Sequence, residues 1–179
     1  MKKSFSFMAT SLFALTVSSA VFATADTGSG NINFTGKIIS AACNIAINGN
    51  QNGTVNLGQW PTSTFKEIGD KSIPQKFTID VTECTDGNFK FNFTGTSDTA
   101  NSNLLKVSVA DGVGIAIADA NNTQIKLNTT AGEESNANVS IANGKGAASL
   151  PLQAYYQSTK DQVGAGQADA TVRVTLQQK

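Results

Sequence analysis

The 179-residue chain contains no histidine. Without histidine it cannot form a Ser-His-Asp triad, a Cys-His nucleophile pair or an imidazole metal site. An enzyme built from this sequence would have to rely on carboxylate pairs or lysine chemistry. Charged residues make up only 15% of the chain, with 13 basic and 13 acidic side chains. Because no basic stripe is present to neutralise phosphates, the composition argues against nucleic-acid binding.

Long apolar runs are also missing, apart from one near the N-terminus. Residues 5–17 are mostly apolar, but the run is short for a membrane span and is interrupted by Ser and Thr. A basic start precedes it, and an A-x-A pattern follows at residues 23–25. This order is typical of a secretory signal peptide. We expect a cleaved leader of residues 1–25, with cleavage after Ala23 as the alternative, and no stable membrane insertion.

Removal of the leader leaves 154 residues, enough for one domain with its own core. The leader carries two of the 13 basic residues and none of the 13 acidic ones, so the processed chain has 11 basic residues and a net charge of −2. Such a weakly charged domain has little electrostatic protection against self-association. This property suits a protein that assembles with others.

The chain has two cysteines, Cys43 and Cys84. In the oxidising compartment that export implies, two cysteines favour one disulfide. The bond would close a loop of 42 residues, counting both cysteines, and chain entropy gives it about 4 kcal/mol. The alternative is a metal site or a reactive thiol, for which two isolated cysteines without histidine are poorly suited.

Clusters of Gly, Asn, Asp, Ser and Thr divide the chain after the leader into short runs with alternating apolar residues. A period of two places each apolar set on one face of a sheet. No segment has a helical period of useful length, although one helical turn fits residues 62–67. Seven or more short antiparallel strands predict an all-β, immunoglobulin-like sandwich rather than a barrel. The alternating sets are Phe77, Ile79 and Val81; Phe89, Phe91 and Phe93; Val113, Ile115 and Ile117; Ile125 and Leu127; Leu150, Leu152, Ala154 and Tyr156; and Val172, Val174 and Leu176.

The segment that follows the leader has a graded strand pattern. Gly28, Gly30, Ile32 and Phe34 share one face of residues 26–36. The glycines make it weak as an isolated strand, because glycine costs backbone entropy and packs nothing. It is either a frayed lead into the first strand or an extended segment kept available for another sheet.

The other end of the chain, residues 168–179, alternates strongly and predicts a strand. In an immunoglobulin-like sandwich a further strand should lie beside it, and the sequence offers none. The open edge would expose an apolar slot and unpaired backbone groups. A strand donated by another chain would fill the slot and pair with the backbone groups, which is recognition by β-augmentation.

The order of these features resembles the chaperone–usher pilins, of the type 1 and long polar fimbria kind. The resemblance covers essentially the whole chain after the leader, and its motifs are individually weak but specific in their shared order. They are residues 34–44 (FTGKIISAACN), 55–58 (VNLG), 65–72 (FKEIGDKS), 77–84 (FTIDVTEC), 91–95 (FNFTG), 112–119 (GVGIAIAD), 124–127 (QIKL), 152–156 (LQAYY) and 163–170 (VGAGQADA).

The resemblance implies an incomplete immunoglobulin-like β-sandwich, residues 37–179, that lacks its final strand. A periplasmic chaperone would lend a strand, and at the outer-membrane usher the extension 26–36 of the next subunit would replace it, giving a fibre on the cell surface. Identical or related subunits would be the main partners, with a host glycan or surface receptor reached through the pilus. No cofactor or metal is implied.

The resemblance also assigns roles by position. Gly28, Gly30, Ile32 and Phe34 would face the neighbour's groove, and Cys43 and Cys84 would form the disulfide. Val172, Val174 and Leu176 would meet first the chaperone and then the donor strand. Members of the family commonly have tyrosine as their penultimate residue. In this chain the matching position is Leu176, and three residues follow it.

Three other functions fit parts of the sequence. A secreted carbohydrate-binding sandwich could use Trp60, Tyr155 and Tyr156, although these rings also suit a core or a strand edge. A hydrolase could use Glu133, Glu134 and Asp169, although the adjacent glutamates read more simply as a solvated turn. A minor adaptor pilin is compatible with the same single-domain length.

Overall fold

The computed structural model describes residues 31–35, 43–130, 136–144 and 146–179. The chain divides into two units, Met1–Ile38 and Ile39–Lys179. In the first unit the described residues 31–35 form no helix or strand and are exposed. The expected leader, residues 1–25, and the beginning of the extension, residues 26–30, lie outside the described residues.

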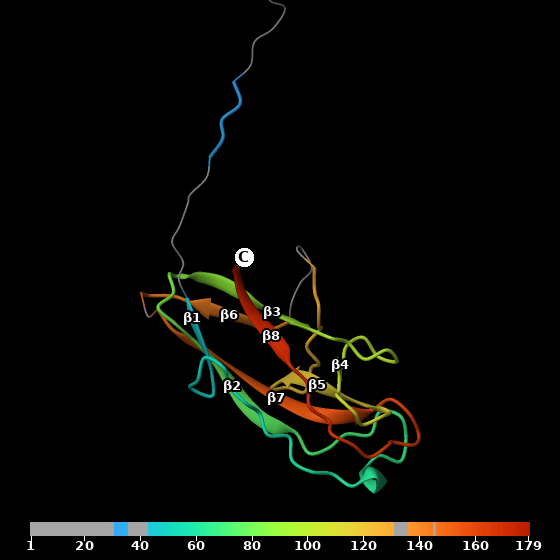
Figure 1. Ribbon diagram of the computed structural model, residues 1–179. Coiled ribbons are helices and arrows are strands. Elements are labelled where there is room, and N and C mark those ends of the chain that lie inside the picture. The colour runs from blue at the N-terminus through green and yellow to red at the C-terminus, as the bar shows by residue number, and fades with distance from the viewer. Residues whose placement is uncertain (1–30, 36–42, 131–135, 145) are drawn as a thin grey trace, which may run out of the picture. The chain divides into compact units, whose positions relative to one another are not determined.

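The second unit is built from strands, with a single turn of 3-10 helix among the residues described. Figure 1 shows the strands in two sheets, and all of the strand pairs are antiparallel. One sheet has the order β1-β2-β7-β5-β4 and the other the order β6-β3-β8. The elements are β1 (Asn44–Ile47), η1 (Thr62–Thr64), β2 (Gln75–Thr82), β3 (Gly87–Gly95), β4 (Leu105–Lys106), β5 (Val113–Asp119), β6 (Asn138–Ile141), β7 (Ala148–Ser158) and β8 (Val172–Gln178).

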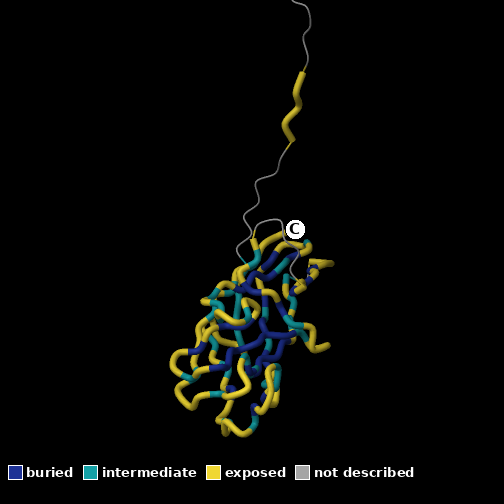
Figure 2. Tube along the Cα trace, turned by 90° about the vertical axis from the view of Figure 1, so that its right-hand side faces the viewer, coloured by how far each residue is buried: buried dark blue, intermediate teal, exposed yellow. Residues whose placement is uncertain are grey.

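The core lies between the two sheets and consists of the residues that the period of two selects. Phe89, Phe91 and Phe93 of β3 are almost fully buried and belong to one apolar cluster with Ile79 and Val81 of β2. Figure 2 shows the buried positions gathered in the interior of the second unit and the exposed ones around its periphery. The predicted all-β sandwich and its core strands are therefore confirmed.

Strand β5 differs from the simple alternation because it is buried on both faces. Ala116 and Ala118 form a second cluster with Leu104 and Tyr155, separate from the main core. Residues on this face have to be small, since a Cβ atom on Gly114 would lie 2.8 Å from the Cβ of Leu104. Leu104, at the end of the segment before β4, therefore covers the outer face of β5.

The predicted strand at Ile125 and Leu127 is a connection between the sheets. Both side chains are buried as expected. However, Gln124 bridges to Ala118 of β5, whereas Leu127 bridges to Phe93 of β3. The segment pairs once with each sheet, so no continuous ladder forms. The helical turn expected in residues 62–67 is present as η1.

Candidate functional site: an open groove beside the last strand

A groove of about 660 Å³ in the second unit opens on the main core. One side, here the 53–59 wall, is the segment of residues 53–59 between β1 and η1. The other side, here the β8 wall, consists of residues 167–172 and Val174. The groove floor is apolar and comes from both sheets: Phe77, Ile79, Phe93, Leu105, Ile115, Ile117 and Ala154.

Strand β8 is an edge strand, and its hydrogen bonds show which backbone groups are used. It pairs with β3 along one side (Figure 1). The backbone N–H of Lys179 donates to the carbonyl of Asn88 at 2.8 Å. Asn88 and Lys179 are therefore a hydrogen-bonded pair of the antiparallel ladder. Because such pairs alternate along an antiparallel ladder, Arg173, Thr175 and Gln177 also bond to β3.

The same alternation turns the backbone groups of Val172, Val174 and Leu176 away from β3. Their side chains are half-buried and pack against the main core. Val172 and Val174 line the groove, whereas Leu176 is not among its lining residues. The edge thus presents an apolar surface and a row of N–H and C=O groups, which is what an incoming strand requires.

The 53–59 wall is extended but pairs with no strand among the residues that the structure describes. Its inward positions follow the period of two: Val55 is half-buried and Leu57 is buried. The wall starts at Gly53, where a Cβ atom would lie 2.5 Å from both the Cβ and the carbonyl oxygen of Ile47. Glycine is therefore the residue that lets this wall lie directly against β1.

Each wall also has one aromatic side chain bonded to its backbone. The indole Nε1 of Trp60 donates to the carbonyl of Leu57 at 2.8 Å. The hydroxyl of Tyr156 donates to the carbonyl of Ala168 at 3.0 Å. Burial, and secondly the charge of Asp169, raises the pKa of Tyr156, so its hydroxyl remains a hydrogen-bond donor at neutral pH.

The candidate donor residues that are described lie on the first unit. Ile32 is 78% exposed and Phe34 is 92% exposed. Exposure of two large apolar side chains on one face of a five-residue stretch is unusual for a monomer, because it leaves their burial energy unused. Gly28 and Gly30 lie outside the described residues, so their role remains a prediction.

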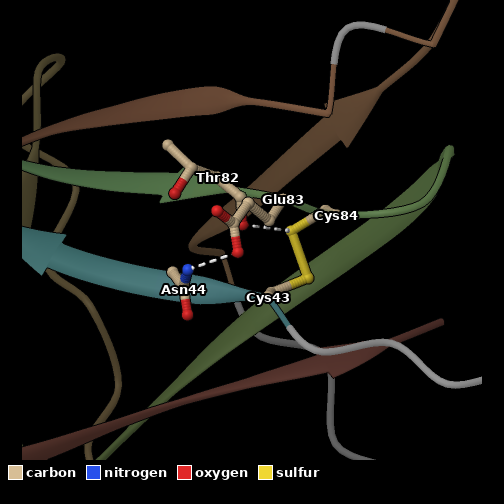
Figure 3. Close-up of a disulfide and its surroundings, with 5 residues drawn as sticks. All are labelled: Cys43, Asn44, Thr82, Glu83 and Cys84. Atoms are coloured by element: carbon tan, nitrogen blue, oxygen red, sulfur yellow. Dashed lines mark hydrogen bonds between the residues drawn. A yellow bond between two sulfur atoms is a disulfide. The ribbon is translucent and has the colours of Figure 1, made fainter.

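The predicted disulfide is confirmed: Cys43 and Cys84 are bonded, with their Cα atoms 4.6 Å apart (Figure 3). Cys43 directly precedes β1, and Cys84 follows β2, the partner of β1. Beside the bond, the Asn44 side-chain amide donates to the Glu83 carboxylate at 2.7 Å. The disulfide thus fastens the start of the sandwich to its second strand.

The residues proposed for sugar binding do not form a common surface. Tyr155 and Tyr156 point to opposite sides of β7, with Tyr155 in the second cluster and Tyr156 at the groove. Trp60 is half-buried, and its indole nitrogen is used by Leu57. The structure therefore assigns these rings to packing, as the sequence analysis had allowed.

The residues proposed for hydrolysis gain no support either. Glu133 and Glu134 lie outside the described residues, and Asp169 is exposed and accepts a hydrogen bond from Gln167 at 2.7 Å. Among the residues described, no three His, Cys, Asp or Glu side chains gather as a metal site. In the same part of the chain, no helix is long and apolar enough to cross a membrane.

Sequence reasoning identified one wall of the groove and missed the other. Val172, Val174 and Leu176 were expected at an open edge. The 53–59 wall was noted only through the VNLG motif, although Gly53, Val55 and Leu57 carry a signal in their spacing of two. The bonds of Trp60 and Tyr156 to backbone carbonyls have no signature in the sequence.

Comparisons with known proteins agree on one family. A family model described as "Fimbrial protein" matches residues 32–178. The type-1 fimbrial protein subunit of Serratia marcescens is 34% identical over 173 residues, which cover 93% of this chain and 96% of that protein. Long polar fimbria protein A of Salmonella typhimurium is 36% identical over 180 residues, which cover 89% of each.

Solved structures agree at the level of the fold. A chaperone–usher pilus structure has a TM-score of 0.60 and 22% identity, and the match covers 86% of this chain and 97% of that one. The P pilus rod subunit PapA has a TM-score of 0.59 and 19% identity, with 72% and 93% covered. These matches confirm the predicted incomplete immunoglobulin-like sandwich. The chain therefore belongs to the fimbrial protein family, whose members are structural subunits of surface pili and not enzymes.

Proposed function

We propose that this subunit polymerises by donor-strand exchange, in which the N-terminal extension of one copy fills the groove of the next. The observation that carries the proposal is the free edge of β8. There the backbone groups that face away from β3 belong to the same residues whose side chains pack on the core. A donor strand would continue the β6-β3-β8 sheet and cover the groove floor, as a final strand does in a complete immunoglobulin-like sandwich.

The extension of residues 26–36 has the composition that this role requires. Ile32 and Phe34 supply two large apolar side chains, each worth about 1.5–3 kcal/mol when fully buried. Main-chain hydrogen bonds to β8 add about 1 kcal/mol each. Gly28 and Gly30 place no side chain in the groove, so they let the two backbones approach closely. These contributions together have to offset the cost of association, which is roughly 4–15 kcal/mol.

The route to the fibre follows from the open edge and from the leader. Residues 1–25 direct export to the periplasm. There the groove would be a liability for aggregation if left empty. We infer that a periplasmic chaperone first lends it a strand and that an outer-membrane usher is the place where the next subunit's extension replaces that strand. Identical or related subunits are then the partners in the finished pilus.

The test is the response of the exported protein to a donor peptide. The chain is produced with its own leader, with and without a pilus chaperone, and is then mixed with a synthetic peptide of residues 26–36. We expect the chaperone to be required for recovery of soluble protein, and the peptide to raise its melting temperature and keep it monomeric.

The matched control is the same peptide with Asp in place of Ile32 and Phe34, which retains the backbone but removes the apolar anchors. It should neither stabilise the protein nor prevent its polymerisation. A protein that is a stable monomer without chaperone and is unaffected by either peptide would show that the groove does not take a donor strand.

A further inference from the structure

The two walls of the groove are attached to the sandwich in different ways, and neither is attached by a full ladder of strand hydrogen bonds. The β8 wall joins β3 from Val172 onward. Before that residue, and throughout residues 53–57, the walls contain no strand-to-strand pair in the described part of the chain. Their positions therefore depend on individual hydrogen bonds, from backbone groups and from side chains, rather than on a ladder.

On the 53–59 wall, Trp60 provides the side chain. Its Nε1 donates to the backbone carbonyl of Leu57, three residues earlier. Its indole lies beside Gly58, where a Cβ atom would be 3.6 Å from Nε1. Trp60 itself does not line the groove, whereas Leu57 and Gly58 do. The indole thus holds the wall from behind without touching whatever occupies the groove.

On the β8 wall, hydrogen bonds hold residues 167–169 from both sides of the segment. From outside, the backbone N–H groups of Val109 and Ala110 and the hydroxyl of Ser108 all donate to the carbonyl of Gln167, at 2.9, 2.9 and 3.0 Å. From the groove side, the Tyr156 hydroxyl donates to the next carbonyl, that of Ala168. Tyr156 belongs to β7, so its bond ties this wall to the larger sheet, whereas the bond from the Gln167 side chain to the Asp169 carboxylate stays within the wall.

We propose that Trp60 and Tyr156 are positioning residues for donor-strand capture, which hold the two groove walls in place before the donor arrives. The inference rests on the proposed function. An inserted strand needs a neighbour about 4.8 Å away for its hydrogen bonds, here β8, and it must also fit between that strand and the 53–59 wall across the groove. A wall that is already ordered loses less conformational freedom on binding, and the donor then binds more tightly without any new contact.

The test compares Trp60→Phe and Tyr156→Phe in the exported full chain after removal of the leader. Each substitution keeps an aromatic ring and removes the one hydrogen-bond donor of interest. Ser149→Ala is the matched control, because it removes an exposed bond to Asp80 in the β2–β7 pair, and neither residue lines the groove. Binding of a fluorescent peptide of residues 26–36 is measured by anisotropy for all four proteins.

We expect about threefold to tenfold weaker peptide binding for each aromatic variant, the range that follows from losing one hydrogen bond, and no change for Ser149→Ala. Hydrogen exchange gives a readout that general destabilisation would not produce. Without peptide, Trp60→Phe should speed exchange only in residues 53–59 and Tyr156→Phe only in residues 167–171. Bound peptide should restore the protection in both.

Two negative results have different meanings. If the unsubstituted protein does not bind the peptide, the proposed function fails and this inference with it. If that protein binds and both aromatic variants bind equally well with unchanged exchange, the walls need no positioning residues and only this inference fails. Should Tyr156→Phe not fold, the unsubstituted protein at a pH high enough to ionise Tyr156 removes the same donor and decides the question for that wall.

Discussion

Tyr156 combines a half-buried ring on the groove floor with a hydroxyl bonded to the β8 wall. Burial and then the nearby charge of Asp169 raise the pKa of this hydroxyl. The folded protein therefore keeps the proton at a pH where the unfolded chain, with a tyrosine pKa of about 10, releases it. The stabilisation due to this proton is complete below about pH 10 and is lost as the pH rises through the raised pKa.

This linkage predicts a pH-dependent difference between the unsubstituted protein and Tyr156→Phe. At pH 8 the unsubstituted protein should have the higher melting temperature, because it makes one more hydrogen bond. Above pH 10 the difference should shrink, and it should vanish when the hydroxyl is ionised. Thermal unfolding followed by circular dichroism measures both. Tyr155→Phe is the control for alkaline effects in general, and a difference that stays constant with pH would contradict the assignment.

At the scale of elements, the strands were the most predictable part of the chain. The period of two identified the core-facing residues of β2, β3 and β7. On β7 it missed that Gln153 and Tyr155 of the opposite face are buried as well. The same pattern described β5 incompletely, since Leu104 of the segment before β4 and Tyr155 of β7 cover its second face. It also predicted a strand at Ile125, where the chain crosses between sheets and only long-range contacts decide the pairing.

The candidate site was predictable only where it is a strand. The alternation of residues 168–179 predicts the strand β8, and the resemblance to chaperone–usher pilins implies that its neighbouring strand is missing. The opposite wall has no ladder, and its place depends on the approach of Gly53 to Ile47 and on the bond from Trp60 to Leu57. Such contacts depend on the folded geometry, so residue patterns alone could not reveal them.

The link between β1 and β2 gives a prediction at the scale of elements. β1 pairs with a single strand over four residues, and the Cys43–Cys84 bond adds a covalent attachment at one end of this pair. Replacing both cysteines with serine should lower the free energy of unfolding by about 4 kcal/mol, as expected for a loop of this length. Urea denaturation of the chaperone-released protein measures the change.

Reduction of the unsubstituted protein with dithiothreitol is the companion measurement, since it opens the bond without changing any residue. Both should produce a similar loss. A loss below about 1 kcal/mol in both cases would mean that the pairing of β1 with β2 and the Asn44–Glu83 hydrogen bond suffice to order this end.

For the molecule as a whole, the proposed mechanism separates folding of the domain from its assembly. The residues that would complete the neighbour belong to the unit Met1–Ile38, and the groove belongs to the unit Ile39–Lys179. A substitution in the extension should therefore alter polymerisation without altering the groove. A substitution in the core would instead alter both the groove and polymerisation, because it lowers the stability of the domain.

Ile32→Asp tests this separation most sharply. Burying a carboxylate against the apolar groove floor costs far more than the burial of isoleucine gains, so donor-strand insertion should fail. The chaperone complex should still form, because its strand would occupy the same groove of an unchanged domain. Electron microscopy of surface pili and co-purification of the chaperone measure the two outcomes.

Asn33→Asp provides the matched control, since it introduces the same charge one position away, on the opposite face of the extension. If the alternation of this segment determines which side chains enter the groove, Asn33→Asp should assemble fibres and Ile32→Asp should not. Loss of fibres in both variants would point to a general intolerance of charge in the extension. Normal fibres from Ile32→Asp would refute the assignment of Ile32 to the donor face, and the free edge of β8 would then need a different partner.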